Sequence, residues 1–228
     1  MNTYTTTYQT ETRTVSDFQL VLLRSQHENE LVITQGETES MTIEAPPEIL
    51  SRIQTQVRQG RLSIELDGSL VDKIADALTT SLTRPRIRYH LAVKDLRELA
   101  VHAVATVELP RLATPELRLK ISGVADVHIE ALTAEKLLVE FRGPGRVEIA
   151  GQVVEQQVEL FGPGQYYALD LASCRARVEL KGLGQARVWV EDQLEARVDG
   201  PGGVTYRGHP QVRQRVSPIG YVTRASMS

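Results

Sequence analysis

The stretch of residues 137–149, LLVEFRGPGRVEI, decides the fold, because it joins two runs of alternating apolar residues through a Gly-Pro-Gly corner. Close copies of this corner recur along the chain, and the first glycines of the last four lie 19, 20 and 18 residues apart. The corner glycines are Gly123, Gly143, Gly145, Gly162, Gly164, Gly182, Gly184, Gly200 and Gly202. A unit this short cannot bury its own apolar face, so consecutive units must stack, and the repeat predicts a solenoid.

With Gln156 as the one exception, apolar residues stand two, four and six positions before each first glycine, as the buried face of a strand requires. These positions hold Leu117, Leu119 and Ile121, then Leu137, Val139 and Phe141, then Gln156, Val158 and Leu160, then Ala176, Val178 and Leu180, then Leu194, Ala196 and Val198. Equivalent strands of successive units must run in the same direction, and crossovers between parallel strands are right-handed. We therefore predict an all-β fold, a single-stranded right-handed parallel β-helix (solenoid) with coils of about 20 residues.

The whole chain, residues 1–228, reads as one β-helix domain with irregular ends. We expect less regular initial coils and a cap in residues 1–90, regular coils in residues 91–208 and a closing coil in residues 209–228. Alternating runs on both sides of Gly60 predict a hairpin within residues 53–66. A short helix is expected within residues 69–82, where Leu70, Ile74 and Leu78 share one face.

The corners also carry a conformational prediction. In Gly-Pro-Gly, proline suits the second position of a type II turn and glycine suits the third, where φ is positive. We therefore expect positive φ at Gly145, Gly164 and Gly184.

Composition excludes several classes of function. The net charge is −3 and the basic residues are dispersed, which gives no electrostatic footprint for nucleic acid. The single cysteine, Cys174, excludes an internal disulfide framework, and no apolar run approaches the roughly 18 residues of a membrane span. The compartment stays open. The leaderless sequence as given favours the cytoplasm, whereas a removed signal peptide would mean the cell surface or the extracellular space.

A resemblance to a known family follows from these motifs. The pattern Leu117-x-Leu119-x-Ile121-Ser122-Gly123 with its later copies, and the opening LVITQG of residues 31–36, resemble the bacterial family of putative auto-transporter adhesins, head GIN domain. The resemblance implies a right-handed parallel β-helix from a family of mostly exported or lipid-anchored proteins. It implies no catalytic residues. The chain departs from the family in lacking a leader and a lipobox cysteine, and in its Gly-Pro-Gly corners.

One column of carboxylates is a candidate calcium site. Glu140, Glu159 and Glu179 stand three positions before successive first glycines, so they should stack on one outward face. Calcium prefers oxygen ligands, but it takes six to eight of them. We favour the alternative, in which Arg142, Arg177 and Lys181 neutralise the column as surface ion pairs, and we expect neither a metal nor a cofactor.

The remaining candidates have structural explanations that we favour. The five histidines fall in different coils, which argues against a metal site. Tyr167 and Trp189 should be exposed and could stack on a sugar, although packing is the commoner role of such rings. The other candidates are the alternating Arg84, Arg86 and Arg88, read as a solvated strand face, and Cys174, read as an inert thiol. No Ser/His/Asp, Cys/His or phosphate-loop arrangement appears, so we expect no catalytic residues.

The sequence therefore predicts a non-enzymatic, adhesin-like scaffold that presents flat β-helix faces to a protein or a cell-surface polymer such as a glycan. A homo-oligomer is compatible with this reading. One alternative is a self-assembling structural scaffold similar to bactofilins, which polymerise end to end. A weaker alternative is a carbohydrate-active β-helix enzyme.

Overall fold

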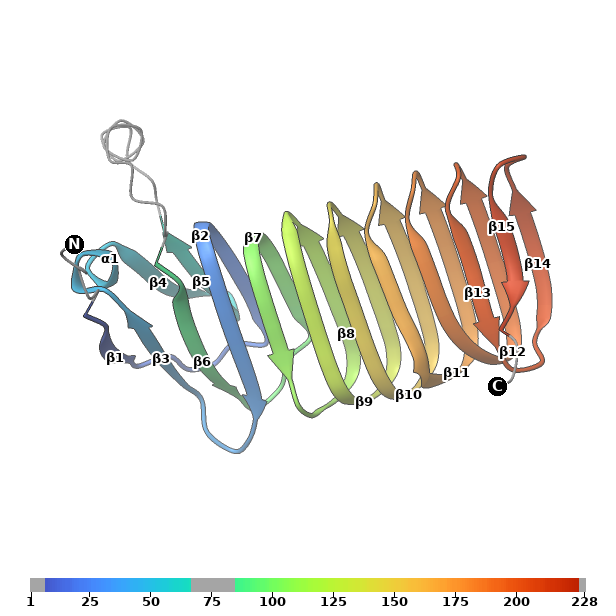
Figure 1. Cartoon of the computed structure of the whole chain (residues 1–228). Helices are drawn as coiled ribbons and strands as arrows, with labels where there is room; N and C mark the ends of the chain where they lie inside the picture. The colour runs from blue at the N-terminus through green and yellow to red at the C-terminus, as the bar shows by residue number, and fades with distance from the viewer. Residues whose placement is uncertain (1–6, 67–84, 226–228) are drawn as a thin grey trace, which may run out of the picture.

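The repeat winds the chain into a right-handed parallel β-solenoid, as predicted (Figure 1). A computed structural model describes residues 7–66 and 85–225. The elements are β1 (Gln9–Arg13), β2 (Leu20–Gln35), β3 (Ser40–Ala45), α1 (Pro47–Leu50), β4 (Ile53–Arg58), β5 (Arg61–Leu66), β6 (Ile87–Val93), β7 (Glu98–Leu109), β8 (Leu112–Ser122), β9 (Val124–Arg142), β10 (Gly145–Phe161), β11 (Gln165–Lys181), β12 (Gln185–Asp199), β13 (Gly203–Arg207), β14 (Gln211–Val216) and β15 (Tyr221–Arg224). In Figure 1 the front strands run downward, the rear strands run upward, and the coils advance towards the C-terminus on the right.

The coils stack into two opposed sheets, which we call face A and face B. Face A comprises residues 28–32, 104–109, 124–129, 145–149, 165–168, 185–189, 203–207 and 221–224. Face B comprises residues 20–24, 98–101, 118–122, 136–142, 155–161, 175–181, 193–199 and 211–216. The corners lead from face B to face A. The long strands β9 to β12 begin on face A and bend round to face B, whereas β2 and β7 begin on face B and continue through the corner to face A.

The apolar columns predicted from the repeat form the core between the two faces. Leu137 pairs with Leu117 on one side and with Gln156 on the other, and the same register continues through every regular coil. All fifteen predicted positions are buried, including Gln156. Each coil therefore covers the apolar surface that its neighbours cannot bury alone.

Gln156 is tolerated inside the core because both polar atoms of its amide have hydrogen-bond partners. Its Nε2 donates to Ser173 Oγ at 2.8 Å, and the Tyr166 hydroxyl donates to its Oε1 at 3.0 Å. Ser173 Oγ in turn donates to the Trp189 carbonyl oxygen at 2.6 Å. Burial raises the pKa of Tyr166 far above its ordinary value, so the hydroxyl stays protonated and remains a donor.

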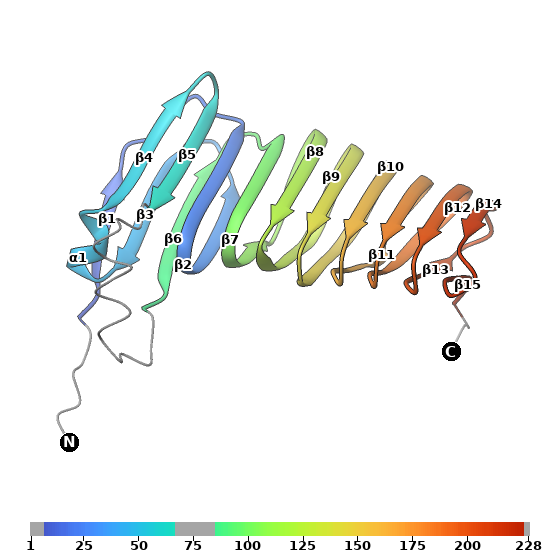
Figure 2. The same ribbon diagram turned by 90° about the horizontal axis from the view of Figure 1, so that it is seen from above.

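The N-terminal end is built differently from the regular coils. β2 lies between β6 and β7, so β3 to β6 all precede the return of the chain to the other side of β2. The predicted hairpin forms as β4 and β5, with Ile53 paired to Leu66, and it stands beside β2 in Figure 2. Arg13 ties this end together, since its Nη1 donates to the Ile53 carbonyl at 2.6 Å and its Nη2 to the Leu50 carbonyl at 3.1 Å.

The helix expected within residues 69–82 lies outside the described residues. A helix that the sequence did not predict, α1, occupies Pro47–Leu50, with Pro47 in its first turn. Proline suits that place because it has no backbone N–H to leave unpaired there. No described helix is long and apolar enough to cross a membrane.

The corner prediction was right for Gly145, at φ +126°, and wrong for Gly164 and Gly184, whose φ is not positive. In those corners the positive φ falls on the first glycine instead, as in Gly182 at +126°. The third glycine is needed for a different reason. A Cβ added to Gly184 would stand 3.0 Å from the carbonyl oxygen of Gly164, because successive corners stack directly on one another.

We predict that Gly145→Ala destabilises the protein. Its φ of +126° disfavours any side chain, and the new Cβ would lie 2.8 Å from the carbonyl carbon of Ala125 in the coil below. The backbone conformation alone should cost roughly 1–3 kcal/mol, measured by chemical denaturation. Gly36→Ala is the matched control, since nothing lies within 4 Å of its added Cβ. Equal stability of the two variants would contradict the stacked-corner account.

A second prediction concerns the buried amide. Tyr166→Phe removes the donor to Gln156 Oε1 and leaves that oxygen buried without its partner, which should cost about 1–3 kcal/mol in unfolding free energy. The double variant Tyr166→Phe/Gln156→Leu should recover part of this loss, because both polar partners are then apolar. If the loss of the double variant equals the sum of the losses of Tyr166→Phe and Gln156→Leu, the two groups do not act together.

Candidate functional site

The C-terminal coils of face A carry alternating cations and aromatic rings. Arg146 of β10 and Arg187 of β12 both lie over the ring of Tyr167 of β11, each with its guanidinium carbon 4.9 Å from the ring centroid. One coil further, the guanidinium of Arg207 of β13 lies 4.3 Å from the ring of Trp189 of β12. We call these five residues the cation–aromatic ladder. It crosses four successive coils.

In-register stacking of parallel strands builds this ladder. Tyr167 pairs with Arg187, and Trp189 pairs with Arg207, so these rings and cations are separated by one coil spacing of about 4.8 Å. Arg146 reaches Tyr167 diagonally, because the residue of β10 in register with Tyr167 is Glu148. Polar contacts fix the rings: the Tyr167 hydroxyl donates to Gln165 Oε1 at 2.9 Å, and Trp189 Nε1 donates to Glu191 Oε1 at 2.5 Å. Both rings are half-buried.

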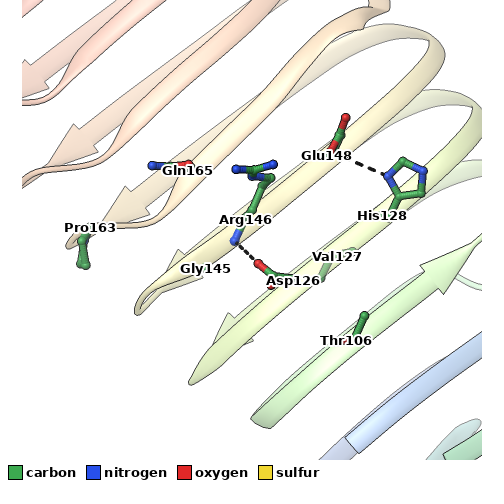
Figure 3. A pocket seen from close by; sticks show the side chains of 9 residues that line it. All are labelled: Thr106, Asp126, Val127, His128, Gly145, Arg146, Glu148, Pro163 and Gln165. Atoms are coloured by element: carbon green, nitrogen blue, oxygen red, sulfur yellow. Dashed lines mark hydrogen bonds and ion pairs between the residues drawn. The ribbon is translucent and has the colours of Figure 1, made fainter.

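Two shallow hollows adjoin the N-terminal end of the ladder. Their volumes are about 540 Å³ and 570 Å³, and His128, Arg146 and Glu148 line both of them. Figure 3 shows the first hollow, in which Arg146 lies beside Glu148. The backbone N–H of Arg146 donates to Asp126 Oδ1 at 3.0 Å. His128 Nδ1 lies 4.0 Å from Glu148 Oε2. Here the surface is mixed in charge.

Charge changes along face A. The coils of β7, β9 and β10 bear outward carboxylates, which are Glu108, Asp126 and Glu148. Beyond β10 the same two outward columns hold uncharged or basic residues. These are Gln165, Gln185, Gly203 and Tyr221 in one column, and Tyr167, Arg187, Thr205 and Thr223 in the other. These two columns therefore lose their carboxylates in the C-terminal half of the face, where the acidic residues beside the ladder are Asp170 and Glu191.

The predicted orientation of the aromatic residues holds, but the sugar-stacking hypothesis needs correction. Tyr166 is fully buried and Tyr206 packs against the core, as expected for inward positions. The ring of Tyr167, however, has a guanidinium group from the coil on either side of it, and one also covers Trp189. These ring faces hold cations in place instead of presenting bare surface to a sugar.

The three predicted carboxylates stack on face B as expected. Glu159 pairs with Glu140 on one side and with Glu179 on the other. Each carboxylate has a polar partner, which completes a ladder of exposed ion pairs and hydrogen bonds. The contacts are Arg142 Nε to Glu140 at 2.8 Å, Gln157 Nε2 to Glu159 at 3.4 Å and Arg177 Nη2 to Glu179 at 2.7 Å. Hydrogen bonds to Glu179 raise the pKa of Arg177. Within the described ranges, no group of three or more His, Cys, Asp or Glu is suited to hold a metal ion.

The other predicted residues lie apart from the ladder. Arg86 and Arg88 pair with Glu28, Glu30 and Glu44, and hydrogen bonds to Glu44 and Glu30 raise the pKa of Arg88. Arg84 falls outside the described residues. Cys174 is exposed with a free thiol.

Sequence reasoning missed one pair of reactive side chains. His102 Nδ1 and Ser122 Oγ are in hydrogen-bonding contact on face B, near the corner. Their separation of 20 residues, one coil length, was the signal that could have found them. Burial, Arg24 and Lys120 all lower the pKa of His102. No described carboxylate pairs with His102, so the pair lacks the third group that orients a catalytic histidine.

A parallel solenoid with exposed strand faces defines a class of repeat proteins that present surfaces to partners. The chain belongs to the family described as putative auto-transporter adhesin, head GIN domain, whose profile matches residues 22–210. This confirms the resemblance inferred from the repeat. No curated protein matches the chain.

Solved structures share the fold. A putative adhesin from Bacteroides fragilis NCTC 9343 is 21% identical, with a TM-score of 0.87 over 97% of this chain and 98% of that one. A putative adhesin from Parabacteroides merdae ATCC 43184 is 19% identical, with a TM-score of 0.70 over 96% of each chain. A putative lipid binding protein from Parabacteroides distasonis ATCC 8503 is 16% identical, with a TM-score of 0.69 over 96% of this chain and 97% of that one. At these identities the likeness shows the fold alone.

We predict that His102 makes the protein less stable in acid. Its pKa in the folded protein is below the ordinary 6.5, so between the two values the unfolded chain binds more protons. Stability is therefore lost as pH falls through this window, and the loss is absent above it. The melting temperature of His102→Gln minus that of the wild type should be larger at pH 5 than at pH 7.5. A difference between the two proteins that does not change with pH would contradict this.

Proposed function

We propose that the protein is a non-enzymatic, adhesin-like scaffold that binds a protein or a cell-surface polymer on face A. The observation that carries this proposal is the cation–aromatic ladder, a row of interacting side chains held in register by four coils. Membership of a family of putative adhesins supports the same role.

The architecture suits binding in preference to chemistry. Sheet backbone fixes each outward side chain, so a ligand meets a surface that is already ordered, and little conformational entropy is lost on binding. The hollows beside Arg146 are shallow, and their walls are the side chains of neighbouring strands instead of long loops. A polymer lying along the solenoid could contact the same column in coil after coil.

The test blocks face A without altering its charge. Gln185→Trp places a bulky ring in the middle of face A, and Gln157→Trp does the same on face B as a matched control. Binding of the purified proteins is measured by biolayer interferometry against neutral polysaccharides, acidic polysaccharides and matrix proteins. We expect at least one ligand to bind, about tenfold more weakly to Gln185→Trp and equally well to Gln157→Trp.

Two outcomes would contradict the proposed function. One is the absence of binding to every member of the panel. The other is the release of new reducing ends from a polysaccharide incubated with the pure protein, which would show catalysis.

A further inference from the structure

We propose that the cation–aromatic ladder recognises an acidic polysaccharide, whose acidic groups are bound by the guanidinium groups of Arg146, Arg187 and Arg207. This inference rests on the proposed function, because it names the ligand class for the same surface. It follows from the pairing of the cations, their geometry and the residues between them.

The first observation is a difference in pairing between the two faces. On face B, three guanidinium groups are neutralised, since those of Arg142, Arg177 and Arg197 lie 2.8, 2.7 and 2.8 Å from carboxylate oxygens. Arg142 also lies over the ring of Phe161. On face A, within residues 7–66 and 85–225, no carboxylate lies within 4.0 Å of the three ladder guanidinium groups, which contact aromatic rings instead. Their positive charge is available to a ligand.

The second observation is the geometry of the stack. A guanidinium group lying over an aromatic ring interacts through its flat face, so its N–H groups remain at the edge. Such edges fit carboxylate and sulfate groups, which can accept two parallel hydrogen bonds from one guanidinium. Tyr167 holds Arg146 and Arg187 on opposite sides, and Trp189 holds Arg207, so the rings act as spacers and supports.

The third observation is what accompanies the cations. Gln165, Gln185, Thr205 and Thr223 share two outward columns with Arg146, Tyr167 and Arg187, and none of the described residues in these columns beyond β10 is acidic. Two acidic residues stand outside these columns: Asp170 lines the second hollow, and Glu191 accepts the hydrogen bond from Trp189. Amide and hydroxyl groups can hydrogen-bond to the hydroxyls of a sugar. Groups of the same kinds return with each coil, at about 4.8 Å, which suits a polymer with a regular repeat.

The same surface favours polysaccharide over nucleic acid. Asp126 and Glu148 bound the ladder at its N-terminal end, and the chain has a net charge of −3. The basic zone is therefore short, whereas nucleic acid is bound through many phosphate contacts. Duplex DNA becomes an outcome of the test.

The experiment measures binding of polygalacturonate, heparin, neutral dextran and duplex DNA to the full chain by biolayer interferometry. The variants are Arg187→Gln/Arg207→Gln on face A and Arg197→Gln on face B as a control of equal charge type. We expect binding of polygalacturonate, heparin or both, weakened at higher salt and weakened at least tenfold by the face A variant. Arg197→Gln should bind within about twofold of the wild type.

A further variant separates positioning from charge. Tyr167→Leu keeps every charge but removes the ring that supports Arg146 and Arg187, and we expect affinity for the acidic polymer to fall about threefold to tenfold. Melting temperatures close to the wild-type value confirm that the variants are folded. An unchanged affinity would show that the ring does not organise the cations.

The remaining outcomes overturn the inference. Acidic polymers bound equally well by the wild type and Arg187→Gln/Arg207→Gln would mean that the ladder is not their site. DNA bound in place of the polysaccharides would assign the ladder to another class of ligand. A neutral polymer or a protein lost only from Gln185→Trp would overturn this inference while the proposed function stands, and binding of nothing at all would overturn both.

Discussion

The close approach of successive coils is the constraint on which the rest of the structure depends. Parallel strands hydrogen-bond at about 4.8 Å, so wherever one corner lies directly over another there is little room for side chains between them. A Cβ on Gly200 would stand 2.7 Å from the carbonyl oxygen of Gly182. Glycine at the corners therefore permits the spacing, and the spacing in turn aligns every apolar column and every outward column of the solenoid.

Alignment has opposite consequences inside and outside. Inside the solenoid, apolar residues of successive coils stack on one another, and the apolar columns form one continuous core. Outside, like charges would also meet, as Glu140, Glu159 and Glu179 do on face B, and repulsion must be relieved by partners from adjacent columns. Both faces also place a ring between two cations, Tyr167 between Arg146 and Arg187 on face A and Phe161 between Arg142 and Lys181 on face B. On face B those cations have carboxylate partners as well. The two faces share a backbone plan and differ in how their outward columns are balanced.

Much of this could be predicted from the sequence because the repeat is local. The period, the inward triplets and the burial of Gln156 follow from alternation and glycine spacing, and all are observed. The turn geometry at Gly164 and Gly184 could not be predicted. Glycine is needed there because an added Cβ would meet atoms of the neighbouring coil, and not because of the φ of its own turn. The cation–aromatic ladder was missed for a similar reason. The sequence indicated that Tyr167 and Trp189 were exposed, but Arg146, Arg187 and Arg207 become their neighbours only through register.

The position of β2 has a consequence for how the chain acquires its structure. β2 is hydrogen-bonded to β5, β6 and β7, all of which follow it in sequence, and Leu31 finds its partners at Tyr89 and Val107. A nascent chain emerging from the ribosome therefore cannot complete its first coil until more than a hundred residues have been made. The coils from β8 onward pair with the one just synthesised and need no such wait, because their contacts span a single repeat. The first coil is thus completed only after β7 has been made, whereas each later coil is completed one repeat after it begins.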